Sequence, residues 1–413
     1  MGLYVMKFGG TSVATPELIK RVARRAISYK RQGDDVVIVL SAMGDTTDEL
    51  ENLAAKITDN PDEREMAVLM ITGERISAAL CAMALNDMGQ PARSFTGWQA
   101  GFRTDDGSPL RSKIAEVSPD RIRAALDSGD VAVVTGYQGL NEDGDETALG
   151  RGGSDLTAVA LACALRADAC EIYTDVDGIY TADPRVVPDA RKIAEISSEE
   201  MLELASSGAR VMQARSVEYA KKHGTVIHVR SSFSEGTGTL IREADPMMEA
   251  VIVRGIAHDM TDAKITLRGV PDRPGIAARV FKQICEDGVN VDMIVQNVSQ
   301  DGFTDLSFTV PVPDVRKTMN ACLVLQREIG AREILADEDI AKISVVGIGM
   351  RSHTGVAAQM FEVLASNDIN IEMISTSEIK ISCIVKEDMA EKAVRVLHDA
   401  FQLNMEGNGT VAG

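Results

Sequence analysis

The segment Leu3-Tyr4-Val5-Met6-Lys7-Phe8-Gly9-Gly10-Thr11-Ser12 decides the fold of the first half of the chain. Its apolar start predicts a short buried strand, and Pro16 opens a helix soon after it. Between the two elements lie a lysine, a pair of glycines and a pair of hydroxyl side chains. Because glycines let backbone N–H groups approach a ligand and the lysine adds a point charge, this turn suits a polyphosphate. The alternative is a tight turn in which Lys7 is only solvated.

The chain lacks the other common nucleotide-binding motifs. A Walker A loop requires a Gly-Lys pair, and no such pair occurs in the sequence. No Gly-x-Gly-x-x-Gly follows an expected strand, and the His-Arg-Asp signature of protein kinases is absent. Nucleotide binding near Lys7 would therefore require a different fold.

Length and composition limit the class of protein. The 413 residues suffice for roughly two or three domains, and a net charge of −19 argues against a general nucleic-acid binder. The 6 cysteines form no Cys-x-x-Cys pair, and His223 and His228 are expected to face opposite sides of a strand, so we expect no metal site. There is no recognisable signal peptide, and no apolar run approaches the roughly 20 residues of a membrane span. We expect a cytoplasmic protein.

Buried strand runs alternate with amphipathic helices up to about Ile241. This pattern is typical of an α/β fold with a mostly parallel sheet between two layers of helices. A composition shift at Ser234–Gly238 and Glu243–Pro246 marks the end of this domain, which we predict to span residues 1–245. The predicted strands are 3–8, 35–40, 131–136, 170–174 and 225–230.

An internal repeat follows the first domain. Residues 274–294 align without a gap on residues 354–374. Each copy is predicted to run strand, helix, strand, strand, helix, strand, except that the second copy lacks its last strand. Because the run 250–256 has no partner strand of its own, we expect it to complete the sheet of the second copy. The first copy would then be inserted between this run and the rest of the second copy. The predicted domains are therefore 264–338 for the first copy, and 248–262 plus 342–407 for the second.

Further segments that carry chemistry follow a strand or open a helix. Ser41–Asp48 offers hydroxyls that either hold a ligand or merely cap a helix. Gly73 lies inside a predicted helix, where glycine costs about 1 kcal/mol, so we expect close packing or ligand approach, although Glu74 alone would be a surface charge. Gly150–Asp155 combines glycines, an arginine and an aspartate at a helix start, which is typical of an anion site. Tyr173–Arg185 follows a strand and suits a nucleobase and phosphates.

Together these motifs resemble the aspartate kinases of the amino acid kinase family. The C-terminal repeat resembles that family's paired ACT regulatory domains, each of which is a ferredoxin-like βαββαβ unit. The chain departs from the family pattern at Leu156, where threonine is common, and at Thr354 of the second ACT turn, where proline is common. Neither position is a proposed catalytic residue. The resemblance rests on KFGGTS at 7–12, SAMGDTTDEL at 41–50, GERIS at 73–77, GRGGSD at 150–155 and YTDVDGIYTADPR at 173–185.

The resemblance implies transfer of the γ-phosphoryl group of ATP, which carries Mg²⁺, to the side-chain carboxylate of L-aspartate. Lys7 would stabilise the transferring group, and Asp155 would hold Lys7 in place. Glu74 would meet the substrate ammonium and Arg151 its α-carboxylate. The implied aspartate-binding residues are Thr47, Glu74, Arg151, Gly152, Gly153 and Ser154. The implied ATP-binding residues are Lys7, Phe8, Gly9, Gly10, Ser41, Thr174, Asp175, Tyr180, Thr181, Ala182, Asp183, Pro184 and Arg185.

The ACT resemblance implies feedback inhibition by lysine, threonine or both. It also implies pairing of ACT domains between chains, which gives a homodimer or a larger assembly. Effectors would bind where the first strand of an ACT domain turns into its first helix and meets the second strand of a paired domain. The repeated Asn-Val-Asp at 290–292 and Asn-Ile-Glu at 370–372 would hold an effector ammonium. The implied allosteric residues are Asp272, Gly275, Ile276, Ala277, Asn290, Asp292, Gln296, Val356, Ala357, Asn370 and Ile371.

Alternatives from other functional classes stay open. One is a non-catalytic amino-acid sensor with a vestigial nucleotide-binding domain, although intact Lys7, Arg151 and Asp155 argue against it. Another is a related kinase that acts on glutamate or acetylglutamate, although the paired repeat fits aspartate better.

Overall fold

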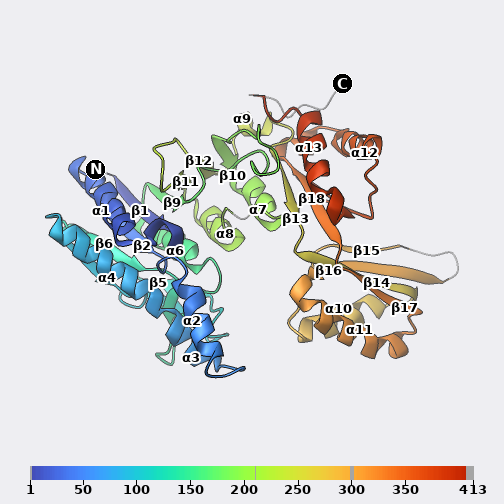
Figure 1. Ribbon diagram of the computed structural model, residues 1–413, viewed down its shortest axis with the longest axis horizontal. Helices are drawn as coiled ribbons and strands as arrows, with labels where there is room; N and C mark the ends of the chain where they lie inside the picture. The colour runs from blue at the N-terminus through green and yellow to red at the C-terminus, as the bar shows by residue number, and fades with distance from the viewer. Residues whose placement is uncertain (1, 210, 298–301, 406–413) are drawn as a thin grey trace. The chain divides into compact units, whose positions relative to one another are not determined.

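The computed structural model describes residues 2–209, 211–297 and 302–405, and these form two compact units (Figure 1). Residues 406 and 407 of the predicted second ACT domain lie outside the described residues. Of the described residues, unit 1 takes those within Met1–Ile179, Lys192–Ala205 and Arg210–Asp245. Unit 2 takes those within Tyr180–Arg191, Ser206–Ala209 and Pro246–Gly413.

Unit 1 is built on an eight-stranded sheet with the order β10-β12-β11-β9-β1-β2-β6-β3. The strands from β11 to β3 in this order are parallel, and β12 is antiparallel to β11. The central strands are β-branched and almost fully buried, as expected for a parallel sheet covered on both faces. The strands are β1 (Leu3–Phe8), β2 (Asp35–Leu40), β3 (Ala92–Phe95), β6 (Val131–Thr135), β9 (Ala169–Thr174), β10 (Glu195–Ser197), β11 (Ile227–Ser231) and β12 (Thr239–Arg242).

Helices cover both faces of this sheet (Figure 1). Helices α1 (Pro16–Arg31) and α4 (Thr72–Asp87) pack on one face, over a core that includes Met6 and Ile38. Thr15 Oγ1 caps α1 by accepting a hydrogen bond from Leu18 N at 3.3 Å. On the other face α6 (Gly153–Leu165) packs against β1, β2 and β9 and is covered by α8 (Ala214–His223), which explains why α6 is apolar all round.

A smaller sheet with the order β5-β4-β7-β8 also belongs to unit 1. These short strands were not predicted from the sequence, because three or four residues give too little alternation to recognise. They are β4 (Phe102–Thr104), β5 (Ile114–Val117), β7 (Gln138–Leu140) and β8 (Glu146–Ala148). The remaining helices are η1 (Gly10–Val13), α2 (Thr46–Ala55), α3 (Glu63–Met70), α5 (Asp120–Asp127) and α7 (Ser198–Ser206).

Unit 2 contains two ferredoxin-like sheets, each with two helices on one face. The first has the order β15-β16-β14-β17, and the second has the order β13-β18-β20-β19. The first comprises β14 (Asp262–Pro271), α10 (Ile276–Glu286), β15 (Ile294–Gln296), β16 (Phe303–Pro311), η2 (Val312–Asp314), α11 (Val315–Ile329) and β17 (Glu333–Asp337). The second comprises α9 (Pro246–Glu249), β13 (Gly255–Asp259), β18 (Ile340–Val346), η3 (Ile348–Ser352), α12 (Val356–Ser366), β19 (Met373–Thr376), β20 (Lys380–Lys386), η4 (Glu387–Met389) and α13 (Ala390–Ala400).

Strand β13 precedes the first repeat in sequence but pairs with β18 of the second. The pairing is antiparallel, from Gly255 opposite Val346 to Asp259 opposite Lys342. The first repeat is therefore inserted into the second as expected, although the strand that pairs is Gly255–Asp259 and not the predicted run 250–256.

Charged pairs cross between the two repeats. Lys342 of β18 is only 4% exposed, and its Nζ donates to Asp262 at 3.0 Å and to Asp292 at 2.6 Å. Glu372, which stands eighty positions after Asp292, pairs with Lys264 of β14. Each repeat thus supplies a carboxylate to a lysine of the other, and these exchanged contacts tie the two sheets together.

The segment Tyr180–Arg191 differs from the predicted domain division. The sequence places it within domain 1–245, yet it packs in unit 2. Its Thr181 O accepts a hydrogen bond from Ile256 N at 2.8 Å. Three of its apolar residues join the core of the second sheet: Ala182, Val186 and Val187.

One helical stretch is long and apolar enough by composition to cross a membrane. It runs through Glu63–Asp87, that is, α3 and α4, and half of its apolar window is buried inside the protein. We did not expect this from the sequence, because its charges interrupt the apolar run. The buried part includes Cys81 and Leu85 of α4, which pack in the core of the main sheet, whereas Ile76, Leu80 and Met83 are exposed.

Candidate active site

Lys7 and Asp155 form a buried ion pair at the carboxyl edge of the main sheet. Lys7 Nζ lies 2.5 Å from Asp155 Oδ1, and the side chains are 12% and 11% exposed. Lys7 is near the end of β1, and Asp155 is in the first turn of α6. The structure therefore brings together the predicted catalytic lysine and its predicted partner.

The parallel register places several predicted residues at this same edge. Phe8 of β1 is in register with Leu40 of β2 and with Tyr173 of β9, and Leu40 is in register with Thr135 of β6. The residues directly after these registered positions are Gly9, Ser41, Gly136 and Thr174. Open α/β sheets bind ligands at this edge.

Gly10 and Gly73 allow close approach of backbone segments around Ala42. A Cβ at Gly10 would lie 3.0 Å from Ala42 O, and Gly44 N donates to Gly10 O at 3.1 Å. A Cβ at Gly73 would lie 2.8 Å from Ala42 Cβ. The glycine inside α4 therefore serves close packing, which was one of the two expected reasons for it.

Glu74 follows Gly73 in the first turn of α4 and is buried, with 5% exposed. Burial raises the pKa of Glu74 to about 7, although hydrogen bonds from the backbone of Glu74 and Ala42 oppose this. Among the described residues, nothing donates a hydrogen bond to its Oε2. A buried carboxylate with an unused oxygen is suited to bind a cationic group, since leaving it unpaired is costly.

Arg151 lies in the glycine-rich loop before α6. It is exposed and forms no ion pair with another described residue. Gly152 has φ of +72°, and a Cβ there would overlap Gln213 at 1.7 Å. A Cβ at Gly153 would lie 2.8 Å from Leu149 Cβ, and Ser154 is buried against Gly136. This loop is therefore shaped by its glycines and leaves the guanidinium of Arg151 available.

Tyr137 is a candidate that the sequence analysis missed. Its φ of +73° is unusual for a residue with a side chain and marks local strain. Burial raises its pKa to about 12, with the charge of Glu74 acting in the same direction and that of Arg151 opposing it. Tyr137 thus lies within electrostatic reach of both groups. Its signal in the sequence was its position directly after Thr135-Gly136, at the end of a buried strand.

The remaining predicted residues of unit 1 lie around this edge. Ser41 O accepts a hydrogen bond from Ser77 Oγ at 2.7 Å, and Thr47 is half-buried in the first turn of α2. Thr174 Oγ1 donates to Asp175 Oδ1 at 3.0 Å, and Asp175 is exposed. Thr135 ends β6 with a buried hydroxyl that forms no hydrogen bond within the described residues.

The predicted nucleotide-binding residues at Tyr180–Arg185 belong to unit 2. Thr181 and Ala182 are buried in that unit, whereas Pro184 and Arg185 are exposed. Arg185 donates to Asp183 through its backbone N–H and its guanidinium, and this hydrogen bonding lowers the pKa of Asp183.

The predicted effector residues lie at the strand-to-helix turns of the two repeats, in the segments that lead into β15 and β19, and in β15 itself. Gly275 and Gly355 have φ of +95° and +100° and begin α10 and α12 in the same way. Asn290 and Asn370 are both exposed at matching positions. The Asp292 carboxylate, predicted to hold an effector ammonium, is bonded to the ammonium of Lys342. The other predicted effector residues are Asp272, Ile276, Ala277, Gln296, Val356, Ala357 and Ile371.

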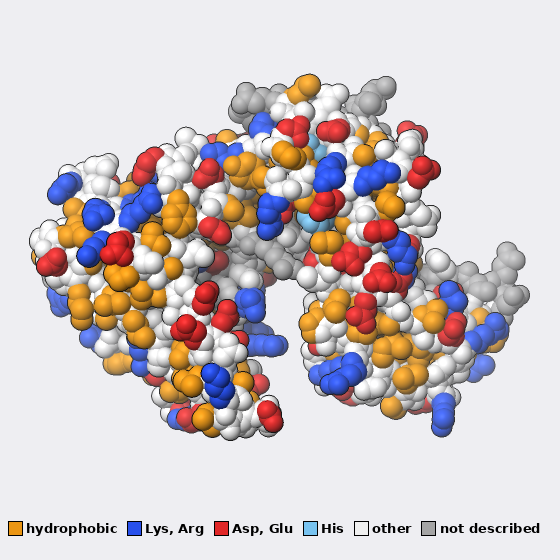
Figure 2. Space-filling model, in the orientation of Figure 1, with side chains coloured by type: hydrophobic (Ala, Val, Ile, Leu, Met, Phe, Trp, Pro, Cys, Tyr) orange, Lys and Arg blue, Asp and Glu red, His pale blue; other side chains and the backbone are white. Residues whose placement is uncertain are grey.

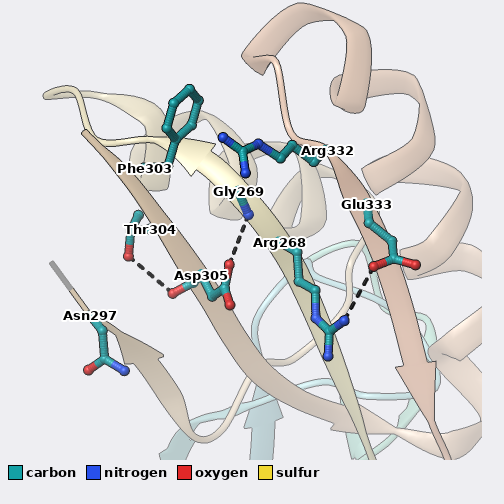
Figure 3. Close-up of a pocket in the computed structure, with 8 residues that line it drawn as sticks. All are labelled: Arg268, Gly269, Asn297, Phe303, Thr304, Asp305, Arg332 and Glu333. Atoms are coloured by element: carbon teal, nitrogen blue, oxygen red, sulfur yellow. Dashed lines mark hydrogen bonds and ion pairs between the residues drawn. The ribbon is translucent and has the colours of Figure 1, made fainter. Parts of the chain in front are cut away.

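A cavity of about 450 Å³ opens on the first sheet of unit 2 (Figure 3). Its charged groups already have partners. Arg268 Nη1 donates to Glu333 at 3.4 Å, Asp305 accepts from Gly269 N at 2.8 Å, and Arg332 lies 4.4 Å from the ring centroid of Phe303. None of the predicted effector residues lines this cavity.

The chain matches known protein families over most of its length. The amino acid kinase family matches residues 2–231, and the ACT domain matches residues 265–323 and 343–401. An aspartokinase from Mycolicibacterium smegmatis is 51% identical over 416 residues, which cover 100% of this chain and 99% of that protein.

Solved structures share the fold over nearly the whole chain. Aspartokinase III of E. coli in complex with aspartate and ADP has a TM-score of 0.81 at 26% identity, covering 96% of this chain and 99% of that chain. The structure of the same E. coli enzyme in complex with lysine and aspartate has a TM-score of 0.75 at 26% identity, with the same coverage.

Proposed function

The chain belongs to the aspartate kinases of the amino acid kinase family, and we propose that it transfers the γ-phosphoryl group of ATP to the side-chain carboxylate of L-aspartate. The product would be 4-phospho-L-aspartate. ATP enters as its Mg²⁺ complex, so the metal is part of the substrate.

The chemistry matches the groups at the carboxyl edge of the sheet. The side-chain carboxylate of aspartate is ionised at pH 7 and is already a nucleophile, so no general base is required. The difficulty is the repulsion between two anions. Lys7, held by Asp155, and the backbone N–H groups around Gly9 and Gly10 would stabilise the charge on the transferring phosphoryl group.

The observation that carries the choice of substrate is the buried carboxylate of Glu74. Its Oε2 has no partner among the described residues. The charge of Glu74 raises the pKa of Tyr137 and that of Arg151 lowers it, so both groups lie near this side chain. An α-amino acid presents an ammonium and a carboxylate on the same carbon. Glu74 would bind the ammonium, and Arg151 would bind the α-carboxylate in bidentate fashion. Thr47, Ser154 and the N–H groups of the Gly152 loop would complete the aspartate site.

The nucleotide would be bound by Ser41, which follows β2, and by Thr174 and Asp175 at the end of β9. For Tyr180–Arg185 of unit 2, the resemblance to the family alone supports a nucleotide contact.

A hydroxylamine trap tests the reaction directly. Acyl phosphates react with hydroxylamine to give a hydroxamate, which forms a coloured complex with iron. ATP plus aspartate should therefore produce this colour. Glutamate in place of aspartate should produce much less. No hydroxamate with either acid would instead support the non-catalytic sensor, and preference for glutamate would support the related kinase.

We further propose that lysine, threonine or both inhibit the enzyme through the ACT turns of unit 2. The E. coli relative binds lysine, and the turns at Gly275 and Gly355 have matching geometry here. Coupling between effector and active site would amount to roughly 1–3 kcal/mol. ACT domains commonly pair between chains, so we propose a homodimer or larger assembly, testable by light scattering.

We propose a cytoplasmic location for this reaction. All of the cysteines are free thiols, including the buried Cys81, Cys170 and Cys383, as expected in a reducing compartment. Fractionation of cells that express the chain would test this, with recovery in the membrane fraction as the contrary result.

A further inference from the structure

Helix α1 is strongly basic in an otherwise acidic chain. It carries Lys20, Arg21, Arg24, Arg25, Lys30 and Arg31 against the single acid Glu17, so its six positive charges and one negative charge give +5. The whole chain has a net charge of −19. Figure 2 shows Lys and Arg side chains gathered over the region of α1. Solubility alone does not account for such a local excess of positive charge.

Three arginines of α1 converge with one from β11 on a cavity of about 280 Å³. The guanidinium groups are those of Arg21, Arg24, Arg25 and Arg230, and Tyr173 also lines the cavity. The Cζ atoms of Arg25 and Arg230 lie 4.6 and 5.7 Å from the centroid of the Tyr173 ring. Cation–π contacts of this kind hold these two guanidinium groups in place.

The negative charges around this cavity do not balance the four arginines. Arg230 is paired with the buried Glu171 at 3.0 Å, and its Nε is buried without a hydrogen-bond partner in the described structure. Arg25 is paired with Glu235 at 2.9 Å, but that carboxylate is 84% exposed, and exposed pairs contribute little. The two carboxylates leave a surplus of two positive charges.

Arg21 and Arg24 are the arginines that carry this surplus. Arg21 Nη2 donates to the carbonyl of Phe233 at 2.9 Å, which leaves its charge uncompensated. Arg24 is exposed and forms no ion pair with any residue that the structure describes.

The cavity lies on the opposite face of the main sheet from Lys7. Successive residues of a strand point to opposite faces. Phe8 stacks on Tyr173 with ring centroids 4.5 Å apart, in the core beneath α1, whereas Lys7 pairs with Asp155 of α6. A ligand in this cavity would therefore not occupy the proposed phosphoryl-transfer site.

We propose that these four arginines bind a small anion that carries two or more phosphate-type charges. Guanidinium groups match phosphate oxygens in bidentate geometry, and several of them around one cavity favour a multiply charged ligand. Such a ligand connects α1 with β11 and lies beside Tyr173, the residue directly before Thr174 and Asp175.

Calorimetric titration with inorganic pyrophosphate tests this site. The titration uses the full chain with Lys7→Ala, which weakens phosphate binding at the proposed kinase site and keeps the two sites distinguishable. We expect about one pyrophosphate bound per chain in this background. Adding Arg21→Ala and Arg24→Ala should weaken binding by about tenfold or more, because charge-assisted hydrogen bonds are lost.

The matched control adds Arg31→Ala and Lys222→Ala, which remove the same charge from exposed positions of unit 1 that do not line the cavity. This control should bind pyrophosphate as the parent does. Melting curves without anion should be the same for both double variants, because the replaced side chains are at the surface. Equal weakening in the control would show a general charge effect and overturn the proposal. Unchanged binding without Arg21 and Arg24, or citrate binding as tightly as pyrophosphate, would also overturn it.

Discussion

The ammonium of Lys7 lies 2.5 Å from the carboxylate of Asp155, and both side chains are almost completely shielded from water. Lys7 is therefore fixed in direction by a residue of α6, which itself begins at the glycine loop that carries Arg151. A buried pair of this kind is strongly destabilised when one partner is removed, because the remaining charge has no compensation. The position of the Lys7 ammonium therefore depends on the conformation of the glycine-rich loop at Gly150–Gly153.

Replacing Lys7 should lower turnover strongly, in addition to weakening phosphate binding at the same site. For Lys7→Ala we expect kcat to fall on the order of 10²–10³-fold, because one preorganised charge at the transferring phosphoryl group is lost. Lys20→Ala is the control, since Lys20 is exposed on α1. The hydroxamate assay measures both variants. Near-normal kcat in Lys7→Ala would remove this lysine from the mechanism.

Glu74 should make the use of aspartate depend on pH. Its pKa is raised to about 7 by burial, and only the ionised form attracts the substrate ammonium. We therefore expect kcat/KM for aspartate to increase as the pH rises through about 7, since this parameter reports the free enzyme. In Glu74→Gln, kcat/KM for aspartate should be lower and should no longer increase with pH in this range. Glu17→Gln, at an exposed acid, is the control and should keep the wild-type pH dependence. A wild-type kcat/KM that does not change between pH 6 and pH 8 would contradict the assignment.

Gly152 should be sensitive to the smallest possible substitution. Gly152→Ala places a Cβ 1.7 Å from Gln213 Cγ, in a backbone conformation with φ of +72°. Gly129→Ala is the matched control, because Gly129 has φ of +81° but no atom within 4 Å of the added Cβ. Both variants have the conformational cost of a left-handed alanine, roughly 1–2 kcal/mol, so any larger loss of stability or activity in Gly152→Ala comes from the overlap. Equal effects in the two variants would show that the loop tolerates displacement of Gln213.

Much of the main sheet could be predicted because its strands are continuous apolar runs. The predicted 3–8 and 35–40 coincide with β1 and β2, and the others differ at their ends by one or two residues. In the first repeat the apolar pattern predicts a strand at 289–297, but only Ile294–Gln296 forms β15. Residues 289–293 instead lead into the strand, with Asp292 directed to Lys342.

The parts of the site that could not be predicted depend on contacts between distant segments. Nothing in the sequence around Tyr137 indicates that its backbone is strained or that Glu74 and Arg151 act on it. The packing of Tyr180–Arg191 in unit 2 was missed for the same reason, because its motif was interpreted only as a nucleotide-binding turn. The partners that bury Ala182 and Val187 lie in the C-terminal repeat.

Thr181 should contribute to the stability of unit 2 through His398. Its Oγ1 lies 2.9 Å from His398 Nε2 in a fully buried contact and also accepts from Arg191 N at 3.0 Å. Thr181→Val removes the hydroxyl without changing the side-chain volume, so it should lower the free energy of unfolding by about 1–3 kcal/mol. Thr181→Ser keeps the hydroxyl and should cost less. Urea unfolding measures both, and equal stability of Thr181→Val and the wild type would contradict the role of the hydrogen bond.

His398 should also make unit 2 less stable in acid. Burial lowers its pKa below 6.5, and Arg191 acts in the same direction, while Asp189 and Asp399 oppose this. Because the unfolded chain binds a proton more readily than the folded one, the free energy of unfolding should fall as the pH drops below about 6.5. In His398→Gln this part of the pH dependence should disappear, as urea titrations at pH 5 and pH 7.5 would show. An identical pH dependence in the variant would assign it to other groups.

Point substitutions should separate effector binding from the integrity of the ACT pair. Deleting 264–338 should abolish inhibition, but it would also take one carboxylate from the buried Lys342 and remove Met293 from an apolar cluster with Met373. Asn290→Ala changes only an exposed side chain at the predicted effector turn. We expect its half-inhibitory concentration of lysine or threonine to rise between about 5- and 150-fold, as the loss of roughly 1–3 kcal/mol of coupling requires.

The matched control for Asn290→Ala is Asn320→Ala, which replaces an exposed asparagine on α11 of the same ACT domain. This control should be inhibited like the wild type, and melting curves of both variants should be unchanged because neither side chain is buried. Loss of inhibition in both variants would show that the assay reports a general weakening of the domain. Full inhibition of Asn290→Ala would place the effector away from this turn. The contact between Asp292 and Lys342 would then have only the structural role of holding the two sheets together.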